Sequence, residues 1–325
     1  RPHRISNSLS KNSKSQGQTP ALGGQVLVPI DQALGHQPLG GCWLCPSPTP
    51  VPACPFDLDT IRHQASVARV VYRETVASTN DLALELAALD SHPPGPPLLV
   101  LSGRQTHGRG RRGRRWESAN GSLTFSLLFT HHSPPPLESL PTLALATTLG
   151  IAHALSATLA NAAATVSAPT TPTTPAVMLK WPNDVVVGDR KICGVLLEPR
   201  PGSATTRPAV IVGIGVNVNN SIDPDLAQHA TSLAEQLGCS TPLTDCLIGI
   251  LDEIHSEIQA WHDRDAELPK RWNAACRDLD RQVTVQTPNG EVTGTCRGID
   301  PAGRLLVEDT DGTVTRVVST VVESE

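Results

Sequence analysis

Residues 179–198, LKWPNDVVVGDRKICGVLLE, contain short apolar runs separated by a proline bend and a tight turn. Valine, isoleucine and leucine dominate the runs, which favours strands. The strands are expected at 177–181, 185–187 and 192–198. Pro182 cannot donate a ladder hydrogen bond, so the WPND bend should end a strand and present Asn183 and Asp184 there. The GDR turn predicts a hairpin that returns Lys191 to the same place. The stretch therefore predicts a sheet end at which an amide, a carboxylate and a lysine meet.

The segments on either side alternate between strand and helix patterns. β-Branched and apolar runs predict strands at 67–74, 98–103, 122–130 and 209–219. Helical spacing of apolar residues predicts helices at 77–89, 140–162 and 242–261. Ser78, Thr79, Asn80 and Asp81 open the first helix, since such residues accept hydrogen bonds from free helix N–H groups. Thr241 is expected to cap the last helix.

The chain divides into three parts by composition. Residues 1–55 are rich in Ser, Pro, Gly and Gln, and predict a disordered tail. Cys42, Cys45 and Cys54 lack a fourth metal ligand at suitable spacing, so we interpret them as unrelated thiols. Residues 56–277 predict an α+β domain, a mixed sheet with flanking helices, in which SAPTTPTTPA (167–176) is a surface insertion. Residues 278–325 form short strands between PNG, PAG and TDG turns, which predicts a small β-barrel.

Composition limits the class of protein. The 325 residues carry a net charge of −5, which argues against a general nucleic-acid binder but not against a local basic site. No run of apolar residues is long enough to suggest a membrane span. The eight cysteines have no regular spacing, and no export signal precedes them, so we expect reduced thiols in a cytoplasmic protein.

Residues 104–116, RQTHGRGRRGRRW, concentrate positive charge in this acidic chain. Six of the first twelve are arginine and three are glycine. A guanidinium presents a fixed fork of donors that suits carboxylate and phosphate oxygens, and glycine lets a backbone approach a ligand closely. Three interpretations fit the loop alone: a solvated run of charge, a contact to a nucleic-acid backbone, or a site for a small polyanion such as ATP beside a carboxylate substrate.

Five motifs in this order resemble those of the biotin–protein ligases. They are STN (78–80), GRGRRGRRW (108–116), KWPNDV (180–185), KICGVLLE (191–198) and GIGVNVN (213–219). The resemblance covers about residues 56–325. It implies a catalytic domain similar to that of class II aminoacyl-tRNA synthetases, followed by an SH3-like β-barrel.

The resemblance also implies a reaction in two steps. The carboxylate of biotin attacks the α-phosphate of ATP, with Mg²⁺, and gives biotinyl-5′-AMP and pyrophosphate. A lysine of a biotin carboxyl carrier protein then takes the biotin and releases AMP. Two anions must meet in the first step, and preorganised cations reduce that repulsion. The arginine loop is expected to close over the adenylate and exclude water.

Roles are carried over to the residues that match the family's motifs. Lys191 is expected to bridge the biotin carboxylate and the α-phosphate, and Asp184 to orient or deprotonate the incoming lysine. The catalytic set is Lys191, Arg111 and Asp184. The biotin-binding set is Ser78, Thr79, Asn80, Gln105, Arg109, Gly110, Arg111 and Lys191. The set for ATP and adenylate is Arg109, Arg111, Arg114, Asn183, Asp184, Lys191 and Asn217, with a Mg²⁺ site expected near Asn183 and Asp184.

Three other interpretations remain beside this one. A lipoate ligase or octanoyl transferase is similar in fold, although the arginine loop is typical of the biotin branch. A DNA-binding biotin sensor would need a recognition helix, and residues 1–55 show no such pattern, so we expect no specific DNA binding. A pseudo-enzyme would lack site residues, but Arg109, Arg111 and Lys191 are all present. We expect no membrane association, and either a monomer or a homodimer.

Overall fold

The computed structural model describes residues 54–89, 95–130, 136–165, 176–203, 206–263, 266–288 and 290–318. Nearly all of the expected tail at 1–55 and of the insertion at 167–176 therefore lies outside the described residues.

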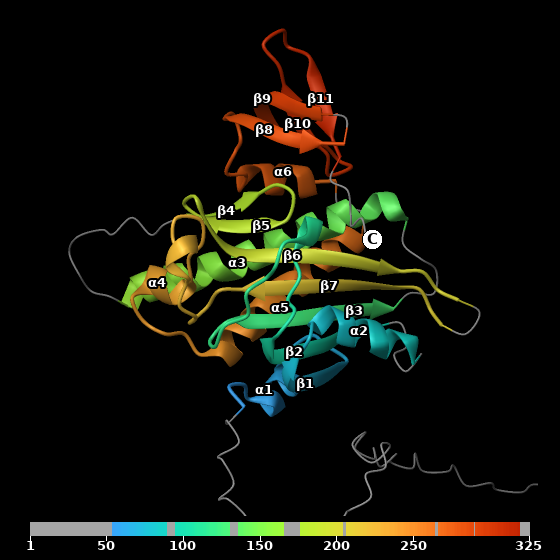
Figure 1. Cartoon of the computed structure of the whole chain (residues 1–325), viewed down its shortest axis with the longest axis vertical. Helices are drawn as coiled ribbons and strands as arrows, with labels where there is room; N and C mark the ends of the chain where they lie inside the picture. The colour runs from blue at the N-terminus through green and yellow to red at the C-terminus, as the bar shows by residue number, and fades with distance from the viewer. Residues whose placement is uncertain are drawn as a thin grey trace, which may run out of the picture. The chain divides into compact units, whose positions relative to one another are not determined.

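A seven-stranded mixed sheet forms the centre of the larger part of the fold (Figure 1). Its strands are β1 (Arg69–Val76), β2 (Leu98–Gln105), β3 (Leu123–Thr130), β4 (Val177–Lys180), β5 (Asp184–Val187), β6 (Arg190–Arg200) and β7 (Ala209–Val216). Their order is β1-β2-β3-β7-β6-β5-β4. Only the β1–β2 pair is parallel, and every other pair is antiparallel. The expected α+β fold is confirmed, with every expected strand in place.

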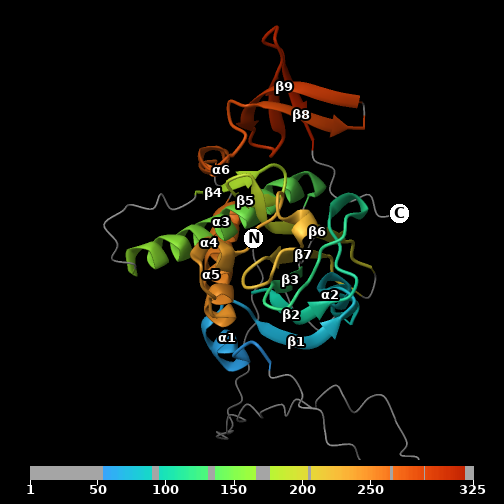
Figure 2. The same cartoon turned by 60° about the vertical axis from the view of Figure 1, so that its left-hand side comes forward.

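Helices cover both faces of this sheet (Figures 1 and 2). The long helices α3 (Leu140–Thr165) and α5 (Leu243–His262) pack against each other on one face, and α2 (Thr79–Ala88) packs on the other against β2, β3 and β7. Gly150 lets α3 and α5 come close, because a Cβ there would lie 2.8 Å from the carbonyl oxygen of Glu253. Three short helices, α1 (Leu58–Gln64), α4 (Leu233–Leu237) and α6 (Leu268–Ala274), were not expected from the sequence.

Helix capping differs from the expectation at two helix starts. Pro242, rather than Thr241, occupies the N-cap of α5, and no side chain caps that end. The backbone of Thr241 is instead bonded in both directions to the side chain of Asn219. Ser78 does occupy the N-cap of α2, but its hydroxyl makes no capping bond. The side-chain oxygen of Gln105 instead accepts a hydrogen bond from the backbone N–H of Thr79.

Helix α3 is long and apolar enough, by length and composition, to cross a membrane over Leu140–Ala162. Two-thirds of its most apolar window (67%) is buried inside the protein. Its buried side chains belong to the main hydrophobic cluster together with those of α5 and β6. These contacts make α3 the central helix of the core, which explains its apolar sequence.

The C-terminal part forms a second, smaller sheet. Its strands are β8 (Gln282–Thr287), β9 (Gly290–Ile299), β10 (Leu305–Glu308) and β11 (Val314–Val317), in the antiparallel order β11-β10-β9-β8. This confirms the expected all-β module. Trp181 donates its indole N–H to the carbonyl of Gly303 at 3.1 Å, so the bend after β4 contacts the turn before β10.

Candidate active site

Three glycines, Gly194 of β6 and Gly213 and Gly215 of β7, leave room on one face of the central sheet. Gly213 and Gly215 of β7 lie opposite Leu196 and Gly194 of β6. A Cβ on Gly213 would come within 2.3 Å of Asn80 Oδ1, and one on Gly215 within 2.2 Å of the Trp116 ring. Any side chain there would displace its neighbour. The GIG pattern therefore lets the start of α2 and the arginine loop lie directly on the strands.

The start of α2 is tied to the end of β2 by a buried network. Gln105 Oε1 accepts from the backbone N–H of Thr79 at 2.6 Å and from its hydroxyl at 3.0 Å. The hydroxyl of Ser126 on β3 lies 2.7 Å from Thr79 Oγ1 and 2.6 Å from Asn80 Oδ1. All four of these side chains are at least nine-tenths buried. The polar groups at this end of the site are therefore held in fixed positions.

The arginine loop is an ordered turn that crosses the sheet in front of β7 and β6 (Figure 1). The N–H of Trp116 donates to Gly108 O at 2.9 Å, and that of Gly110 donates to Arg114 O at 2.6 Å. Arg112 and Gly113 at its tip both have left-handed backbone, with φ of +56° and +68°. These bonds bring both strands of the loop together and hold its arginines over the sheet.

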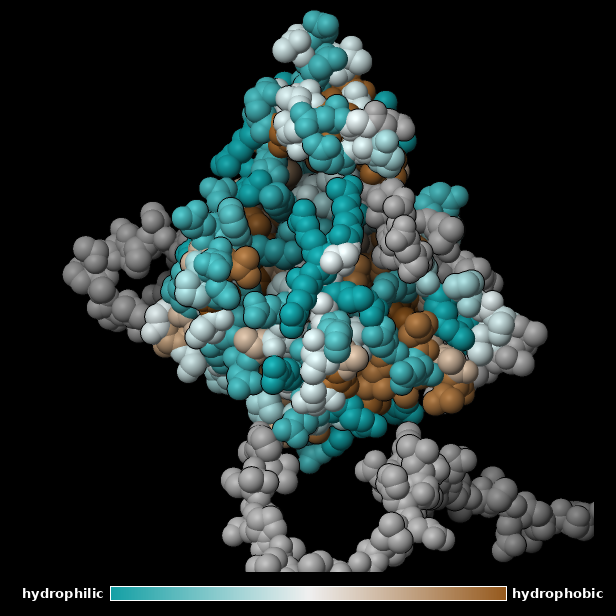
Figure 3. Space-filling view, viewed as in Figure 1, coloured by the Kyte–Doolittle hydropathy of each residue, from teal (hydrophilic) through white to brown (hydrophobic). Residues whose placement is uncertain are grey.

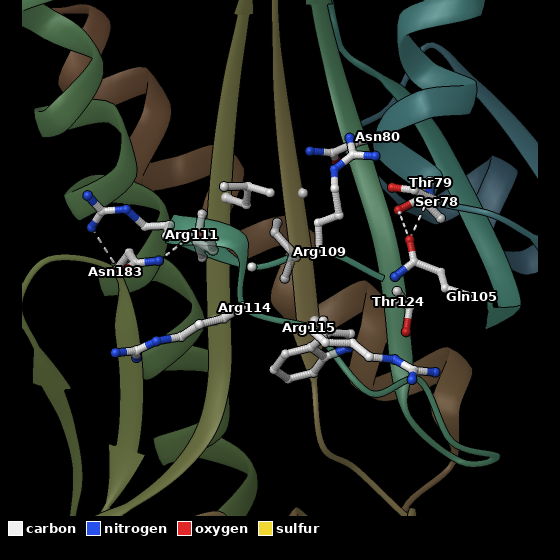
Figure 4. A pocket seen from close by; sticks show the side chains of 18 of the residues that line it. Ser78, Thr79, Asn80, Gln105, Arg109, Arg111, Arg114, Arg115, Thr124 and Asn183 are labelled. Carbon is white, nitrogen blue, oxygen red and sulfur yellow. Dashed lines mark hydrogen bonds between the residues drawn. The ribbon is translucent and has the colours of Figure 1, made fainter. Parts of the chain in front are cut away.

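The loop arginines have different partners. Arg109 donates to Asp81 at 2.8 Å and to Glu198 at 3.2 Å. The pKa of Arg109 is raised overall. Burial alone would lower this pKa, but the hydrogen bond to Asp81 and the negative charge of Glu198 together outweigh burial. Arg111 donates to Asn183 Oδ1 at 3.3 Å (Figure 4). Burial, then the charge of Arg112, lowers the pKa of Arg111.

The β5–β6 hairpin brings Lys191 to the position that the sequence predicts. Its Nζ lies 2.7 Å from Asp184 Oδ1, and 5.9 Å from the centre of the Trp116 ring. Asn183 donates its side-chain N–H to the carbonyl of Val195 at 2.5 Å, which fixes its oxygen toward Arg111. An amide, a carboxylate and two cations therefore converge at this end of the site.

Two adjoining cavities open on this face. The first, of about 210 Å³, is lined by residues of the STN, WPND, KICGVLLE and GIG stretches and by the arginine loop (Figure 4). The second, of about 670 Å³, is bordered by Asn217, Asn220 and residues 221–224, 226, 229 and 230. Four residues line both: Arg114, Arg115, Trp116 and Lys191. The space-filling view of this face shows a band of hydrophilic side chains through its centre (Figure 3). Lys191 is thus placed at the junction of the two cavities.

The structure brings nearly all the predicted site residues together. Those that line the first cavity are Ser78, Thr79, Asn80, Gln105, Arg109, Gly110, Arg111, Arg114, Asn183, Asp184 and Lys191. Asn217 lines the second cavity instead. No site role was expected for Thr124, Gly213, Gly215 or Leu196, which also line the first cavity, or for Asp81 and Glu198, which hold Arg109. Leu196 and Glu198 lie in the KICGVLLE motif, and the alternating glycines of GIG indicate the room on the strands.

Within the part of the chain that the structure describes, no metal cage made by the protein alone is found. No group of three His, Cys, Asp or Glu side chains that could hold a metal ion occurs among the described residues. Asp184 and Asn183 already face Lys191 and Arg111. Together they offer one carboxylate and one amide oxygen, which suits an ion bound mainly by phosphate oxygens.

Comparisons with known proteins agree with this geometry. Residues 72–217 match the Biotin/lipoate A/B protein ligase family, and residues 278–321 match the Biotin protein ligase C terminal domain. A biotin–[acetyl-CoA-carboxylase] ligase of Paracoccus denitrificans is 30% identical over 247 residues, 72% of this chain and 92% of that protein. A bifunctional ligase/repressor BirA of Bacillus spizizenii is 29% identical over 259 residues, 78% of this chain and 73% of that protein.

A solved structure shares the fold. The biotin protein ligase from Aquifex aeolicus in complex with biotin and ATP aligns with a TM-score of 0.62 at 25% identity, over 78% of this chain and 97% of that one. The fold and site define a member of the biotin/lipoate A/B protein ligase family. This chain belongs to that family, as a biotin–protein ligase.

Proposed function

We propose that this chain activates biotin with ATP and transfers it to one lysine of a biotin carboxyl carrier protein. The position of Lys191 carries the proposal, because its ammonium group borders both cavities. The first cavity combines fixed hydrogen-bonding groups with apolar strand positions, which suits the ureido ring and hydrocarbon body of biotin. The second is wider and would take the nucleotide, with Asn217 in its wall.

The first chemical step takes place where the cavities meet. A carboxylate oxygen of biotin attacks the α-phosphorus of ATP, an O–P bond forms, and the bond to the β-phosphate oxygen breaks. Lys191 and Arg114 line both cavities and Arg111 lines the first, so their positive charges can offset the negative charge that accumulates there. Mg²⁺ would enter with the phosphates of ATP, near Asp184 and Asn183, and would neutralise part of their charge.

The second step uses the same junction. The amine of the carrier lysine attacks the acyl carbon of biotinyl-5′-AMP and forms a C–N bond, the nitrogen releases its proton to solvent, and AMP leaves with the electron pair of the broken C–O bond. Among the described residues, Asp184 is the one carboxylate that lines the first cavity. Its oxygen lies beside Lys191 and can accept a hydrogen bond from an incoming ammonium or amine. We therefore assign to it the orientation of the acceptor lysine.

Other expectations stay proposals. We keep 56–277 and 278–325 as domain boundaries, because the division falls between the end of α6 and the start of β8. We place the reaction in the cytoplasm, since the buried cysteines 193, 246, 276 and 296 are free thiols, as in a reducing compartment. The expectation of no specific DNA binding concerns residues 1–55, nearly all outside the described part, and remains a prediction, as does the choice between monomer and homodimer.

Biotin, rather than lipoate, is the expected acid. We expect ATP-dependent pyrophosphate release from the purified chain with biotin, and at least a hundredfold less with lipoate or octanoate at the same concentration. A site with fixed polar groups loses hydrogen bonds to an acid that has no ureido ring, and unpaired buried groups are costly. The measurement is the initial rate of pyrophosphate release with each acid. Faster release with lipoate or octanoate would assign the chain to the other branch of the family.

A further inference from the structure

Glu198 is a carboxylate at the far end of the KICGVLLE strand, and it does not line either cavity. Its side chain is one-quarter exposed (25%). It follows Leu196 on the strand face that is turned toward α2, so it lies just beyond the wall of the first cavity. Glu198 is therefore placed to act on a ligand through the residues that it contacts.

Glu198 contacts two residues from separate parts of the site. Its Oε2 accepts from the side-chain N–H of Asn80 at 2.5 Å. Its Oε1 accepts from Nη2 of Arg109 at 3.2 Å. Arg109 has a second, independent anchor, because its Nη1 donates to Asp81 at 2.8 Å. Loss of the Glu198 charge would therefore leave Arg109 held by Asp81, but would leave Asn80 without its charged acceptor.

The contact with Asn80 has a consequence for hydrogen-bond direction. An ionised carboxylate can only accept, so it holds the NH₂ end of the Asn80 amide and turns Oδ1 toward Ser126. The Ser126 hydroxyl has a single hydrogen and two candidate acceptors, Asn80 Oδ1 and Thr79 Oγ1. As long as Asn80 presents its oxygen, it competes for that hydrogen. If the amide turned over, Ser126 would accept from Asn80 and give its hydrogen to Thr79.

We propose that Glu198 is a positioning residue that fixes the donor and acceptor pattern presented to the substrate by Asn80 and Thr79. This inference rests on the proposed seat of biotin in the first cavity. The ureido group of biotin presents one carbonyl acceptor between two N–H donors, so it requires a site with a complementary fixed pattern. An amide that is free to turn over can match the opposite pattern as well. Glu198 thereby contributes selectivity without touching the ligand.

The test compares biotin with 2-iminobiotin in the purified full-length chain. In 2-iminobiotin a nitrogen that donates replaces the ureido oxygen that accepts. We expect Glu198→Gln to raise KM for biotin about tenfold, since a glutamine amide can donate as well as accept and no longer holds the Asn80 amide in one orientation. KM for ATP should stay within about twofold. The preference for biotin over 2-iminobiotin, measured as the ratio of kcat/KM values from pyrophosphate release, should fall about tenfold.

Two further variants separate this role from simple loop anchoring or loss of stability. Asp81→Asn weakens the other anchor of Arg109 and leaves Asn80 held, so its preference for biotin over 2-iminobiotin should equal that of wild type. If Glu198→Gln does not fold, as judged by its circular dichroism melting curve, Ser126→Ala carries the test. It removes the hydroxyl between Asn80 and Thr79, and it should lower the same preference.

The outcomes are distinct. A wild-type chain that releases no pyrophosphate with biotin would refute the proposed function, and this inference with it. An active wild type whose Glu198→Gln variant keeps the wild-type preference would overturn the inference alone. Equal loss of preference in Asp81→Asn would also overturn it, because the effect would then come from the position of Arg109.

Discussion

Replacement of Lys191 by alanine is expected to slow the formation of biotinyl-5′-AMP roughly a hundredfold, a loss on the order of 3 kcal/mol of transition-state stabilisation. The ammonium group lies at the junction of the two cavities, where a carboxylate and a phosphate must be brought together. Its removal also leaves Asp184, now 2.7 Å from Nζ, without this cation. The variant therefore loses a positive charge and gains an uncompensated negative one where anions must enter.

The measurement is the single-turnover rate of pyrophosphate release with biotin and ATP. Lys270→Ala is the matched control, since that lysine is 82% exposed, pairs with the nearby Glu267 and lines neither cavity. The double variant Lys191→Ala/Asp184→Asn should be faster in this step than Lys191→Ala alone if the unpaired carboxylate contributes. Wild-type adenylate formation by Lys191→Ala would mean that Lys191 does not bridge the two reacting anions.

Replacement of Arg111 by glycine should affect retention of the intermediate more than its formation. Arg111 joins the loop to the WPND bend through its 3.3 Å bond to Asn183. Loss of this side chain, together with the added backbone freedom of glycine, should loosen the loop over the cavity. Biotinyl-5′-AMP would then escape and acylate lysines of other proteins. We expect at least tenfold more biotin on a bystander protein, with pyrophosphate release reduced to a smaller extent.

The experiment mixes each variant with biotin, ATP and a bystander protein that lacks a carrier domain. Bystander biotinylation and pyrophosphate release are measured in the same samples. Arg112→Gly is the matched comparison, because Arg112 already has φ of +56°, which glycine adopts without strain. It should label the bystander less than Arg111→Gly does. If Arg111→Gly makes the adenylate but labels the bystander no more than wild type, the loop is not the element that retains the intermediate.

Local patterns were sufficient to predict most of the fold. Valine and isoleucine runs, and helical spacing in 242–261, predicted strands and helices where the structure has them. Short helices such as α4 and α6 carry too few turns to show a period, so they were missed. The prediction that Thr241 caps α5 was wrong for a different reason. Asn219, twenty-two residues away, binds the Thr241 backbone and leaves the helix to begin after Pro242.

The site was predictable to the extent that its residues lie in motifs. Lys191 and Asp184 were expected together because a hairpin joins them within a few residues. The ion pair between Arg109 and Glu198 spans 89 positions, and no local pattern indicates it. The different partners of the loop arginines could not be predicted for the same reason. Spacing alone does not reveal that Arg109 is held by carboxylates while Arg111 reaches Asn183.

The mass of a carrier domain after reaction is the most direct test of the proposed transfer of biotin to a carrier lysine. The purified chain is incubated with biotin, ATP, Mg²⁺ and an isolated biotin carboxyl carrier domain, and the intact mass of that domain is recorded over time. We expect the addition of one biotinyl group to a single lysine, with one AMP and one pyrophosphate formed for each group transferred. If wild type and Lys270→Ala are folded and bind ATP but the carrier mass does not change, the proposed transfer of biotin is contradicted.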